Sequence, residues 1–407
     1  MCPPKSAPLI VYLNGKQADV SKWQRTHPGG RKVFRIFEQR DATEQFNTFH
    51  SPAARKKMEA MLKASPPVPS GSEQASETAI GRDFAALTAK LTEAGLFAPN
   101  YADEALKLAL TLLPGFLGIY LLLLTAWPGA GSCLLTFSFY LAGWTNHDYL
   151  HHAVIKGDSV RLVAWNNAVG AVLGAYQGYG VEWWRARHNT HHVCTNEIGS
   201  DPDIKTAPVL VFVRQSKQVA AGLNWAQRYQ VWYYLPAMAM MDVYWRFESL
   251  QYVWSKPWSK VWLDAVTLAV HYAALLYVYS GNLRWLAFTM LARGFWTGVV
   301  TFATHYGEDV LPPGHGRSFA EQTSMTSRNI GGGSAVNILT GFISLQTEHH
   351  LFPMMPTANL GRARPFVQAF FAKHGLEYRE SSLLECVRLN MKALEWEHLV
   401  GADAGEQ

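Results

Sequence analysis

Residues 108–127 read LALTLLPGFLGIYLLLLTAW, a run of twenty residues without a charged side chain. At about 1.5 Å of rise per residue, a helix of this length crosses the ~30 Å hydrocarbon core of a bilayer. The break PGAG follows at 128–131, and a second uncharged stretch continues to Asn146. We therefore predict a membrane-spanning helical hairpin, with spans at about 106–127 and 129–146.

A second predicted hairpin has spans at about 262–280 and 284–304. Arg293 interrupts its second helix, and because a charge facing lipid is costly, we expect this side chain to face the bundle or an aqueous pocket. Two further apolar stretches, 163–179 and 231–243, are ambiguous, and we expect both to be interfacial helices. With two hairpins only, all four helices return the chain to one face of the membrane.

The composition agrees with a protein that lies partly in lipid. Charged residues make up 16% of the 407 residues, against roughly 25% in soluble domains. The 15 Trp and 17 Tyr suit the membrane interface. The net charge of +5 comes without a basic run, which excludes nucleic acid as a partner. The four cysteines form no CxxC pair, and the first twenty residues lack a signal-peptide pattern, so we expect a cytosol-facing protein inserted through internal segments.

Two domains joined by a linker are expected along the chain. Residues 8–63 have the short alternating runs of a small soluble α+β domain, and residues 83–400 contain the predicted spans. Residues 64–82 between them are rich in Pro, Ser and Gly and too polar to fold alone, so we predict a flexible linker there.

The small domain carries two histidines in a suggestive context. His27 begins the sequence HPGG, and DATEQF leads to His50, which Ser51 follows. Two imidazoles spaced in this way can bind opposite faces of a haem, which leaves no open position for oxygen and makes the haem an electron carrier. The alternative is that both histidines are ordinary surface residues.

Eight of the 15 histidines fall in three tight clusters, HDYLHH at 147–152, HNTHH at 188–192 and TEHH at 347–350, which Gln346 precedes. On a helix, residues three and four apart share a face, so His188, His191 and His192 are expected to converge on one point. By the same rule His147 and His151 share a face, and His152 turns by about 100° toward a neighbouring site.

Eight imidazoles exceed the four ligands of a structural zinc site and are enough for two metal ions. Imidazole alone suits Zn, Cu, Fe or Ni, so the spacing does not select the metal. A fused one-electron donor, however, has no use beside zinc and favours iron. A solvated helical face is the alternative for any one cluster taken by itself.

These motifs resemble two known families. HPGG with DATEQF and HS is similar to cytochrome b5, and HDYLHH, HNTHH and QTEHH resemble the three histidine boxes of membrane fatty acid desaturases. Gln346 in the place of a histidine, together with the fused haem domain, resembles the front-end subgroup, and algal delta-8-type members look closest. The resemblance implies haem b with His27 and His50 as axial ligands. It also implies two non-haem iron ions and O2 as a co-substrate.

The resemblance implies nine iron ligands, eight from the boxes and a ninth just after the fourth predicted span. They are His147, His151, His152, His188, His191, His192, His305, His349 and His350. Gln346 is expected to be a weak ligand or to orient a water molecule. The carboxylates Asp148, Asp201, Asp203 and Glu348 are expected to accept hydrogen bonds from ligating imidazoles, although Asp201 and Asp203 could equally form a solvated turn.

An acyl substrate needs a narrow apolar tunnel between the spans and the metal site. Glu182, Trp183, Trp184 and Arg187 precede the second box and are candidates for its entrance. An interfacial aromatic belt is the alternative reading of the two tryptophans.

The expected fold class is mainly α: a bundle of four transmembrane helices with a cytosolic histidine-rich cap, joined to the small haem domain. The expected function is front-end desaturation of a long polyunsaturated acyl chain, with a lean toward delta-8 on C20. The chain has no GxGxxG fingerprint, so an NADH-cytochrome b5 reductase is the expected electron donor. The expected location is the endoplasmic reticulum membrane, with the haem domain and boxes in the cytosol. Alternatives are a sphingolipid desaturase, a fatty acid hydroxylase, a membrane-anchored cytochrome and, third, a zinc hydrolase.

Overall fold

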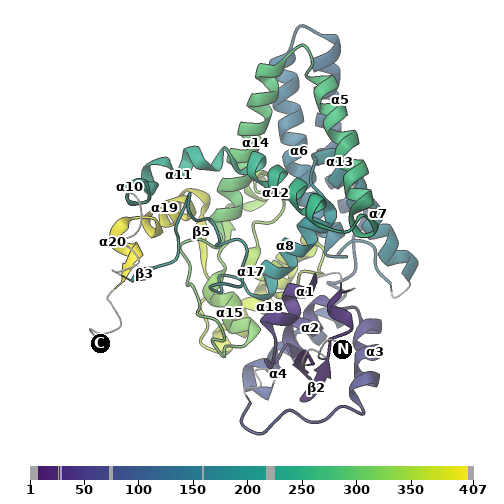
Figure 1. Ribbon diagram of the computed structural model, residues 1–407, viewed down its shortest axis with the longest axis vertical. Coiled ribbons are helices and arrows are strands. Elements are labelled where there is room, and N and C mark those ends of the chain that lie inside the picture. The colour runs from purple at the N-terminus through teal and green to yellow at the C-terminus, as the bar shows by residue number, and fades with distance from the viewer. Residues whose placement is uncertain are drawn as a thin grey trace, which may run out of the picture.

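The computed structural model is mainly helical (Figure 1). It describes residues 8–25, 27, 30–72, 77–157, 160–216 and 225–401. Four long helices stand side by side and project from the rest of the molecule: α5 (Tyr101–Leu124), α6 (Pro128–Leu150), α13 (Trp258–Val278) and α14 (Leu283–Ala303). The predicted hairpins are therefore helical pairs, and α5 and α13 begin a turn earlier than predicted.

Within the described residues, three helices are long and apolar enough to cross a membrane, namely α5, α13 and α14. Large apolar side chains on their outer faces are exposed, among them Phe116 and Val270. Helix α6 is more polar than these three helices. It packs against α5, α7 and α14, so polar side chains such as Ser138 and Thr145 are buried inside the bundle and do not face lipid. The chain is thus an integral membrane protein by its apolar helices, while the count of four spans stays a prediction.

Arg293 lies inside the bundle, as predicted, with 2% of its surface exposed. Its guanidinium donates to the carboxylate of Asp242 (2.8 Å) and to the side-chain oxygen of Gln177 (2.9 Å). Asp242 lies in α12 (Met241–Ser255), at the end of the ambiguous stretch 231–243, and is a buried partner of Arg293. Burial of both charges together makes this pair tolerable inside the bundle.

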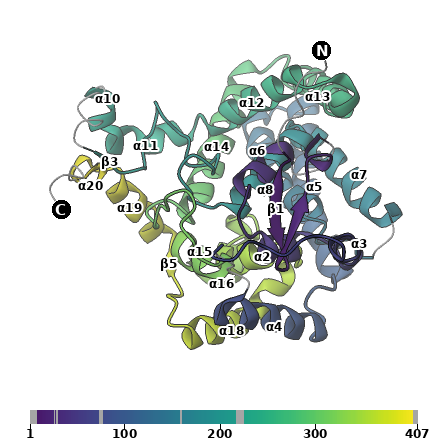
Figure 2. The same ribbon diagram turned by 60° about the horizontal axis from the view of Figure 1, so that its bottom comes forward.

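The remaining elements surround the base of the bundle (Figure 2). The helices are α7 (Val160–Gln177), α8 (Val181–Val193), α10 (Trp225–Arg228), α11 (Gln230–Met238), α15 (Phe319–Thr326), α16 (Gly333–Leu339), α17 (Gln346–Leu351), α18 (Thr357–Lys373), α19 (Leu383–Ala393) and α20 (Trp396–Leu399). Two short parallel pairs join β3 (Gln215–Ser216) to β6 (Val400–Gly401), and β4 (Asn329–Gly331) to β5 (Glu380–Ser382).

The N-terminal domain begins with an antiparallel hairpin of β1 (Ile10–Leu13) and β2 (Lys16–Asp19). Asn14 and Gly15 form its two-residue turn with φ of 50° and 70°, the left-handed pair that an Asn-Gly turn favours. A 3-10 turn η1 (Trp23–Arg25) and three helices complete the domain: α1 (Gly30–Ile36), α2 (Thr43–Phe49) and α3 (Pro52–Leu62). Its apolar core continues into the main domain through Val193 and Cys194, at the end of α8.

Both described parts of the predicted 64–82 linker, 64–72 and 77–82, make ordered contacts. The backbone N–H of Gln17 donates to the carbonyl of Pro66 (2.9 Å), and Val68 donates to Gly15 (3.1 Å). Helix α4 (Ala79–Glu93) then begins within the predicted linker, with Thr78 capping its first turn. Backbone pairing and a side-chain cap offset the poor apolar content that predicted a flexible chain.

Candidate metal centre

Four segments bring the predicted histidines together. His147 lies in the last turn of α6, and α8 carries His188, His191 and His192. The short helix α17 carries His349 and His350, and His305 follows directly after the end of α14. All three predicted boxes and the extra histidine therefore meet at the base of the bundle.

Their ring nitrogens form two groups. Group one contains His147, His151, His188, His192 and His349, and group two contains His191, His305 and His350. In each group the potential ligand atoms lie within 4.8 Å of one another. The groups are neighbours, because the stacked rings of His192 and His350 have centroids 4.1 Å apart.

The histidine doublets of the second and third boxes are each divided between the groups. His192 and His349 belong to group one, whereas their neighbours His191 and His350 belong to group two. Successive helical residues point about 100° apart, so one doublet can serve two sites. The expectation that all three histidines of HNTHH converge on one point is therefore corrected: only the pair four residues apart, His188 and His192, shares a group.

His152 departs from the expected arrangement, because among the described residues it belongs to neither group. Helix α6 ends at Leu150, and His152 takes a left-handed backbone conformation with φ of 55°. Its Nε2 lies 3.0 Å from the side-chain oxygen of Asn167. The helical spacing used for the prediction does not extend past the end of the helix.

Each imidazole of group two is oriented through its Nδ1 atom. That atom lies 3.0 Å from Asp201 Oδ2 in His191, and 2.9 Å from the Thr326 carbonyl in His305. In His350 it lies 3.1 Å from the hydroxyl of Thr195. Such outer partners fix the tautomer and leave Nε2 free to bind a metal.

The donor set fits metal ions. Within the described residues, Nε2 of His151, His305 and His350 is buried without a hydrogen-bond partner, and so is Oε1 of Gln346. Unpaired buried polar atoms are costly, and a bound ion satisfies them. The residues present therefore suit a metal centre better than a core of packed histidines.

Burial keeps most of these imidazoles neutral, which is the form that binds metal. It lowers the pKa of His188, His192 and His350 well below the ordinary value, and neighbouring histidines add to the effect. Burial and His191 lower the pKa of His305 to about 3. Burial also acts to lower the pKa of His191, but the charges of Asp201 and Asp203 offset it and raise that pKa.

Asp148 supports group one in the way that was predicted for it. One oxygen lies 3.3 Å from Nδ1 of His147. The other accepts from the Lys107 ammonium (2.5 Å) and the Thr357 hydroxyl (2.7 Å). The sequence analysis did not predict that Lys107 and Thr357 contact Asp148. The position of Lys107, directly before the uncharged run, could have indicated that its charge needs a buried partner.

Glu348 has a different role from the one predicted. Its Oε1 accepts from the Tyr378 hydroxyl (2.5 Å) and its Oε2 from the Asn329 amide (2.8 Å). It thus ties α17 to β4 and to the chain before β5 instead of accepting from an imidazole. Helical geometry explains this, since His349 and His350 point inward and Glu348 points to another side of the helix.

Asp201 and Asp203 both lie near His191, the second at 3.6 Å from Nδ1. Asp201 also accepts from the backbone N–H of Asp203 (2.8 Å), so the segment does form a turn, but Asp201 is buried and its carboxylate is not solvated. Gln346 donates from Nε2 to the Thr304 hydroxyl at 3.5 Å, which leaves its oxygen directed elsewhere. Gln346 therefore lies next to the segment that carries His305.

A narrow cavity reaches both histidine groups. Its lining includes Trp183, Trp184 and Arg187, three of the four residues that were candidates for a substrate entrance. The ring of Trp184 lies 4.2 Å from that of His188, and Arg187 pairs with Glu248 (2.8 Å). Glu182 does not line this cavity and pairs with Arg185 (2.8 Å) instead.

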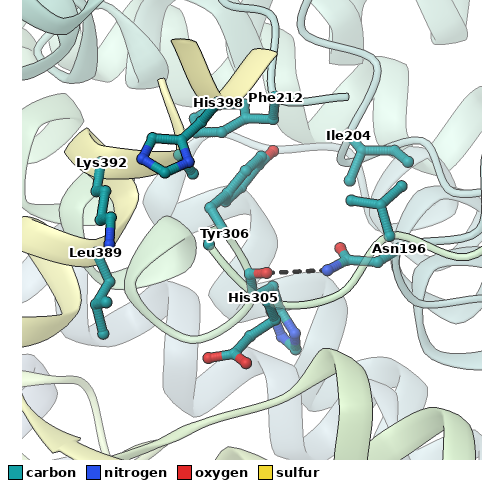
Figure 3. Close-up of a pocket in the computed structure, with 12 residues that line it drawn as sticks. Asn196, Ile204, Phe212, His305, Tyr306, Leu389, Lys392 and His398 are labelled. Carbon is teal, nitrogen blue, oxygen red and sulfur yellow. Dashed lines mark hydrogen bonds between the residues drawn. The ribbon is translucent and has the colours of Figure 1, made fainter. Parts of the chain in front are cut away.

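A larger cavity of about 360 Å³ lies beside the His305 segment (Figure 3). Its lining comes from the chain around Tyr306 and from Leu389 and Lys392 of α19. The Asn196 amide donates to the backbone carbonyl of His305 (2.9 Å), as the dashed line in Figure 3 shows. Asn196 thus holds the His305 segment in place, which its sequence position did not reveal.

The two histidines of the N-terminal domain face each other. Their Nε2 atoms are 3.5 Å apart and their ring centroids 5.7 Å apart. Nδ1 of His50 lies 3.0 Å from the carbonyl of Phe46, which directs Nε2 toward His27. Burial lowers the pKa of His27 to about 4, so the ring is neutral. The pair suits axial haem ligation; Pro28 and Gly29 of the predicted turn lie outside the described residues.

An apolar helix bundle, buried imidazole groups and a domain with facing histidines define a histidine-rich membrane oxidoreductase served by a haem domain. Residues 101–382 match the family model for fatty acid desaturase, and residues 4–66 match that for the cytochrome b5-like heme/steroid binding domain. The chain therefore belongs to the fatty acid desaturase family, as a front-end type with a fused cytochrome b5-like domain.

Three relatives illustrate this membership. The chain is 55% identical to an acyl-lipid 8-desaturase of Rebecca salina, over 97% of the chain and 93% of that protein. It is 30% identical to a delta(8)-fatty-acid desaturase of Euglena gracilis, over 87% of each. It is 27% identical to fatty acid desaturase 3 of Bos taurus, over 92% of the chain and 86% of that protein.

Proposed function

We propose that the chain inserts a cis double bond at the delta-8 position of a C20 polyunsaturated acyl chain, between an existing double bond and the carboxyl end. The names of two relatives, from Rebecca salina and Euglena gracilis, support this regiochemistry. The observation that carries the reaction class is the pair of adjacent imidazole groups, with five and three histidines.

In this proposal each group holds one non-haem iron ion. His147, His151, His188, His192 and His349 would bind one ion, and His191, His305 and His350 the other, with the Gln346 oxygen next to the second group. When bound, iron supplies the O2-dependent redox chemistry that removes hydrogen from unactivated methylene carbons, which no side-chain base can do. The protein contributes ligand orientation, through Asp148 and Asp201, and a site enclosed by buried side chains.

His27 and His50 would hold a haem b between them. When bound, such a haem would supply one-electron transfer, since two imidazole ligands leave no position for oxygen. An NADH-cytochrome b5 reductase is the proposed donor to the haem. The cytochrome b5-like match over residues 4–66 supports the haem assignment.

The acyl chain is proposed to lie in the cavity lined by Trp183, Trp184 and Arg187. Aromatic side chains form part of its wall and polar residues near the histidine groups form the rest, and this lining would fix the reacting carbons beside both groups. Arg187 is paired at this wall with Asp203 (2.9 Å) and Glu248 (2.8 Å), so its charge is compensated and its role would be to hold the wall in shape. Glu182 is not proposed to contact the substrate. Its carboxylate pairs with Arg185 and positions that side chain.

The proposed topology has four spans, α5, α6, α13 and α14, in the endoplasmic reticulum membrane. The haem domain (8–63) and the metal centre then share the cytosolic side, and the desaturase domain covers 83–400. Helices α7, α11 and α12 would lie at the interface. The location of all four histidine-bearing segments at one end of the bundle supports this arrangement (Figure 1).

Expression in yeast fed with defined C18, C20 and C22 polyenes tests the proposal. We expect a new cis double bond at carbon 8 of C20 substrates, located by mass spectrometry of derivatised fatty acids. His188→Ala should abolish the product, and His398→Ala, an exposed histidine outside both groups, should retain it. A hydroxylated product, or unchanged lipids with full expression, would contradict the proposal.

A further inference from the structure

Phe49 connects the two redox regions of the molecule. It is the residue next to His50, which is one of the two facing histidines of the N-terminal domain. Its ring packs edge-on against the ring of His192, with centroids 5.8 Å apart. His192 belongs to group one of the metal centre. Phe49 is therefore joined to the proposed haem ligand through the backbone and to the proposed iron ligand through a ring contact.

The surroundings of Phe49 are aromatic and apolar, and its side chain is partly buried. Its ring also packs edge-on against Phe319 at 6.4 Å, and it contacts the apolar cores of both domains. A continuous path of bonded and touching atoms carries an electron better than a gap, so the placement of this ring is what sets the transfer.

Charged and polar contacts hold the two domains in this orientation. Arg40 makes two hydrogen bonds to the Glu197 carboxylate, at 3.2 and 3.4 Å. Lys32 donates to the carbonyl of Ser200, and Glu44 accepts from the backbone N–H of Phe319 at 2.5 Å. A two-point Arg–carboxylate contact fixes direction as well as distance. The contact is thus specific and keeps the aromatic path aligned.

We propose that electrons pass from the haem to the metal centre through His50, Phe49 and His192, with Phe49 as the positioning residue of this step. The step moves one electron at a time: the ferrous haem is oxidised and the metal centre is reduced. The inference rests on the proposed function only in taking His50 as a haem ligand and His192 as an iron ligand.

Reoxidation of the haem tests this route directly. Full-length protein containing haem and iron is reduced without oxygen and then mixed with O2 and C20 substrate, and haem absorbance is followed in a stopped-flow instrument. Phe49→Leu should slow reoxidation several-fold while haem reduction by the reductase, the haem spectrum and iron content stay unchanged. Phe49→Tyr keeps an aromatic ring and should reoxidise at nearly the wild-type rate.

Two further variants distinguish the effect of the Phe49 ring on reoxidation from the effect of a general loss of packing. Phe84→Leu removes a ring that packs on Phe319 at 6.1 Å, away from His192, and should leave reoxidation unchanged. Arg40→Gln loosens the domain contact without touching the ring and should slow the same step. Wild-type rates in both Phe49→Leu and Arg40→Gln would overturn the proposal, as would an equal loss in Phe84→Leu.

An iron-depleted sample of the wild type provides the background rate. If iron removal leaves haem reoxidation unchanged, the route is overturned, whatever fatty acids the protein makes in yeast. If reoxidation depends on iron and on Phe49 but no alkene forms, the route stands and the proposed desaturation fails. The two claims are therefore tested separately.

Discussion

The two histidine groups of the metal centre differ in how they are built. Group one has five imidazoles, and its Nε2 atoms approach one another closely, with His192 at 2.9 Å from His188 and 3.1 Å from His349. Group two has three imidazoles, and each is held by an oxygen on its outer side. We therefore expect metal binding in group one to depend mainly on the number of imidazole donors. In group two we expect it to depend mainly on how the donors are oriented.

The largest effect is expected for a ligand of group two, because few donors remain after its loss. His350→Ala should remove the iron of group two and reduce the product below detection. His151→Ala in group one leaves four imidazoles and should keep more of its iron. Iron content of the purified proteins and product formation in yeast measure both. Equal iron loss in the two variants would remove the distinction between the groups.

Orientation of group two is weakened by Asp201→Asn. The amide keeps the size of the side chain but loses the charge next to Nδ1 of His191, and such outer partners contribute about 10–100-fold to metal affinity or activity. We expect a loss in that range, measured as product and as iron retained against a chelator. Asp309→Asn is the matched control, because that carboxylate pairs with Arg379 at the surface. An unchanged iron affinity in Asp201→Asn would contradict the role of orientation.

Gln346 occupies a position beside group two, and substitutions there test whether this position contributes to iron binding. Gln346→Ala removes a buried oxygen that has no hydrogen-bond partner in the described structure, and we expect a several-fold loss of activity. Gln346→His adds a fourth imidazole and should strengthen iron binding in group two, seen as slower loss to a chelator. The same iron retention in all three proteins would show that this position does not face the ion.

The smallest effect on activity is expected at the haem domain, where Glu44 is buried against Phe319. Burial raises the pKa of Glu44 from 4.5 to about 7, although the N–H of Phe319 opposes the shift. A raised carboxyl pKa favours the folded state below pH 4.5, and that contribution is lost as the pH rises through 7. The shift corresponds to roughly 3 kcal/mol at about 1.4 kcal/mol per unit.

Glu44→Gln should remove this dependence while the amide oxygen still accepts from Phe319. We expect the temperature of haem release to fall between pH 5 and pH 8 in the wild type and to stay nearly constant in Glu44→Gln. Glu38→Gln, at an exposed position of the same domain, is the control and should follow the wild type. Parallel curves for all three proteins would mean that Glu44 is charged throughout.

Local patterns predicted what depends on local geometry. Helical spacing placed His188 with His192, and the cost of a charge in lipid required Arg293 to face the bundle. The same spacing failed for His152, because the helix ends two residues earlier, and for the convergence of His191 with its neighbours. Sequence spacing alone does not say where a helix stops or how many centres its faces serve.

Other parts depend on contacts between distant segments. Lys107 and Thr357 are separated by 250 residues and meet at Asp148. The Tyr378 and Asn329 contacts of Glu348 likewise come from different elements. The polar surface of α6 is explained only by its central position in the bundle. No single-sequence pattern contains these pairings, since each needs the three-dimensional arrangement of the helices.

The apolar core shared between the haem domain and the end of α8 has a consequence for domain exchange. A haem domain cut out at its boundary would expose the side chains that now cover Val193 and Cys194, and a foreign replacement would have to match that patch. We expect chimaeras to need exchange of residues 193–200 together with the donor domain. The haem domain is therefore expected to fit the desaturase domain of its own chain and not to be freely exchangeable with other haem domains.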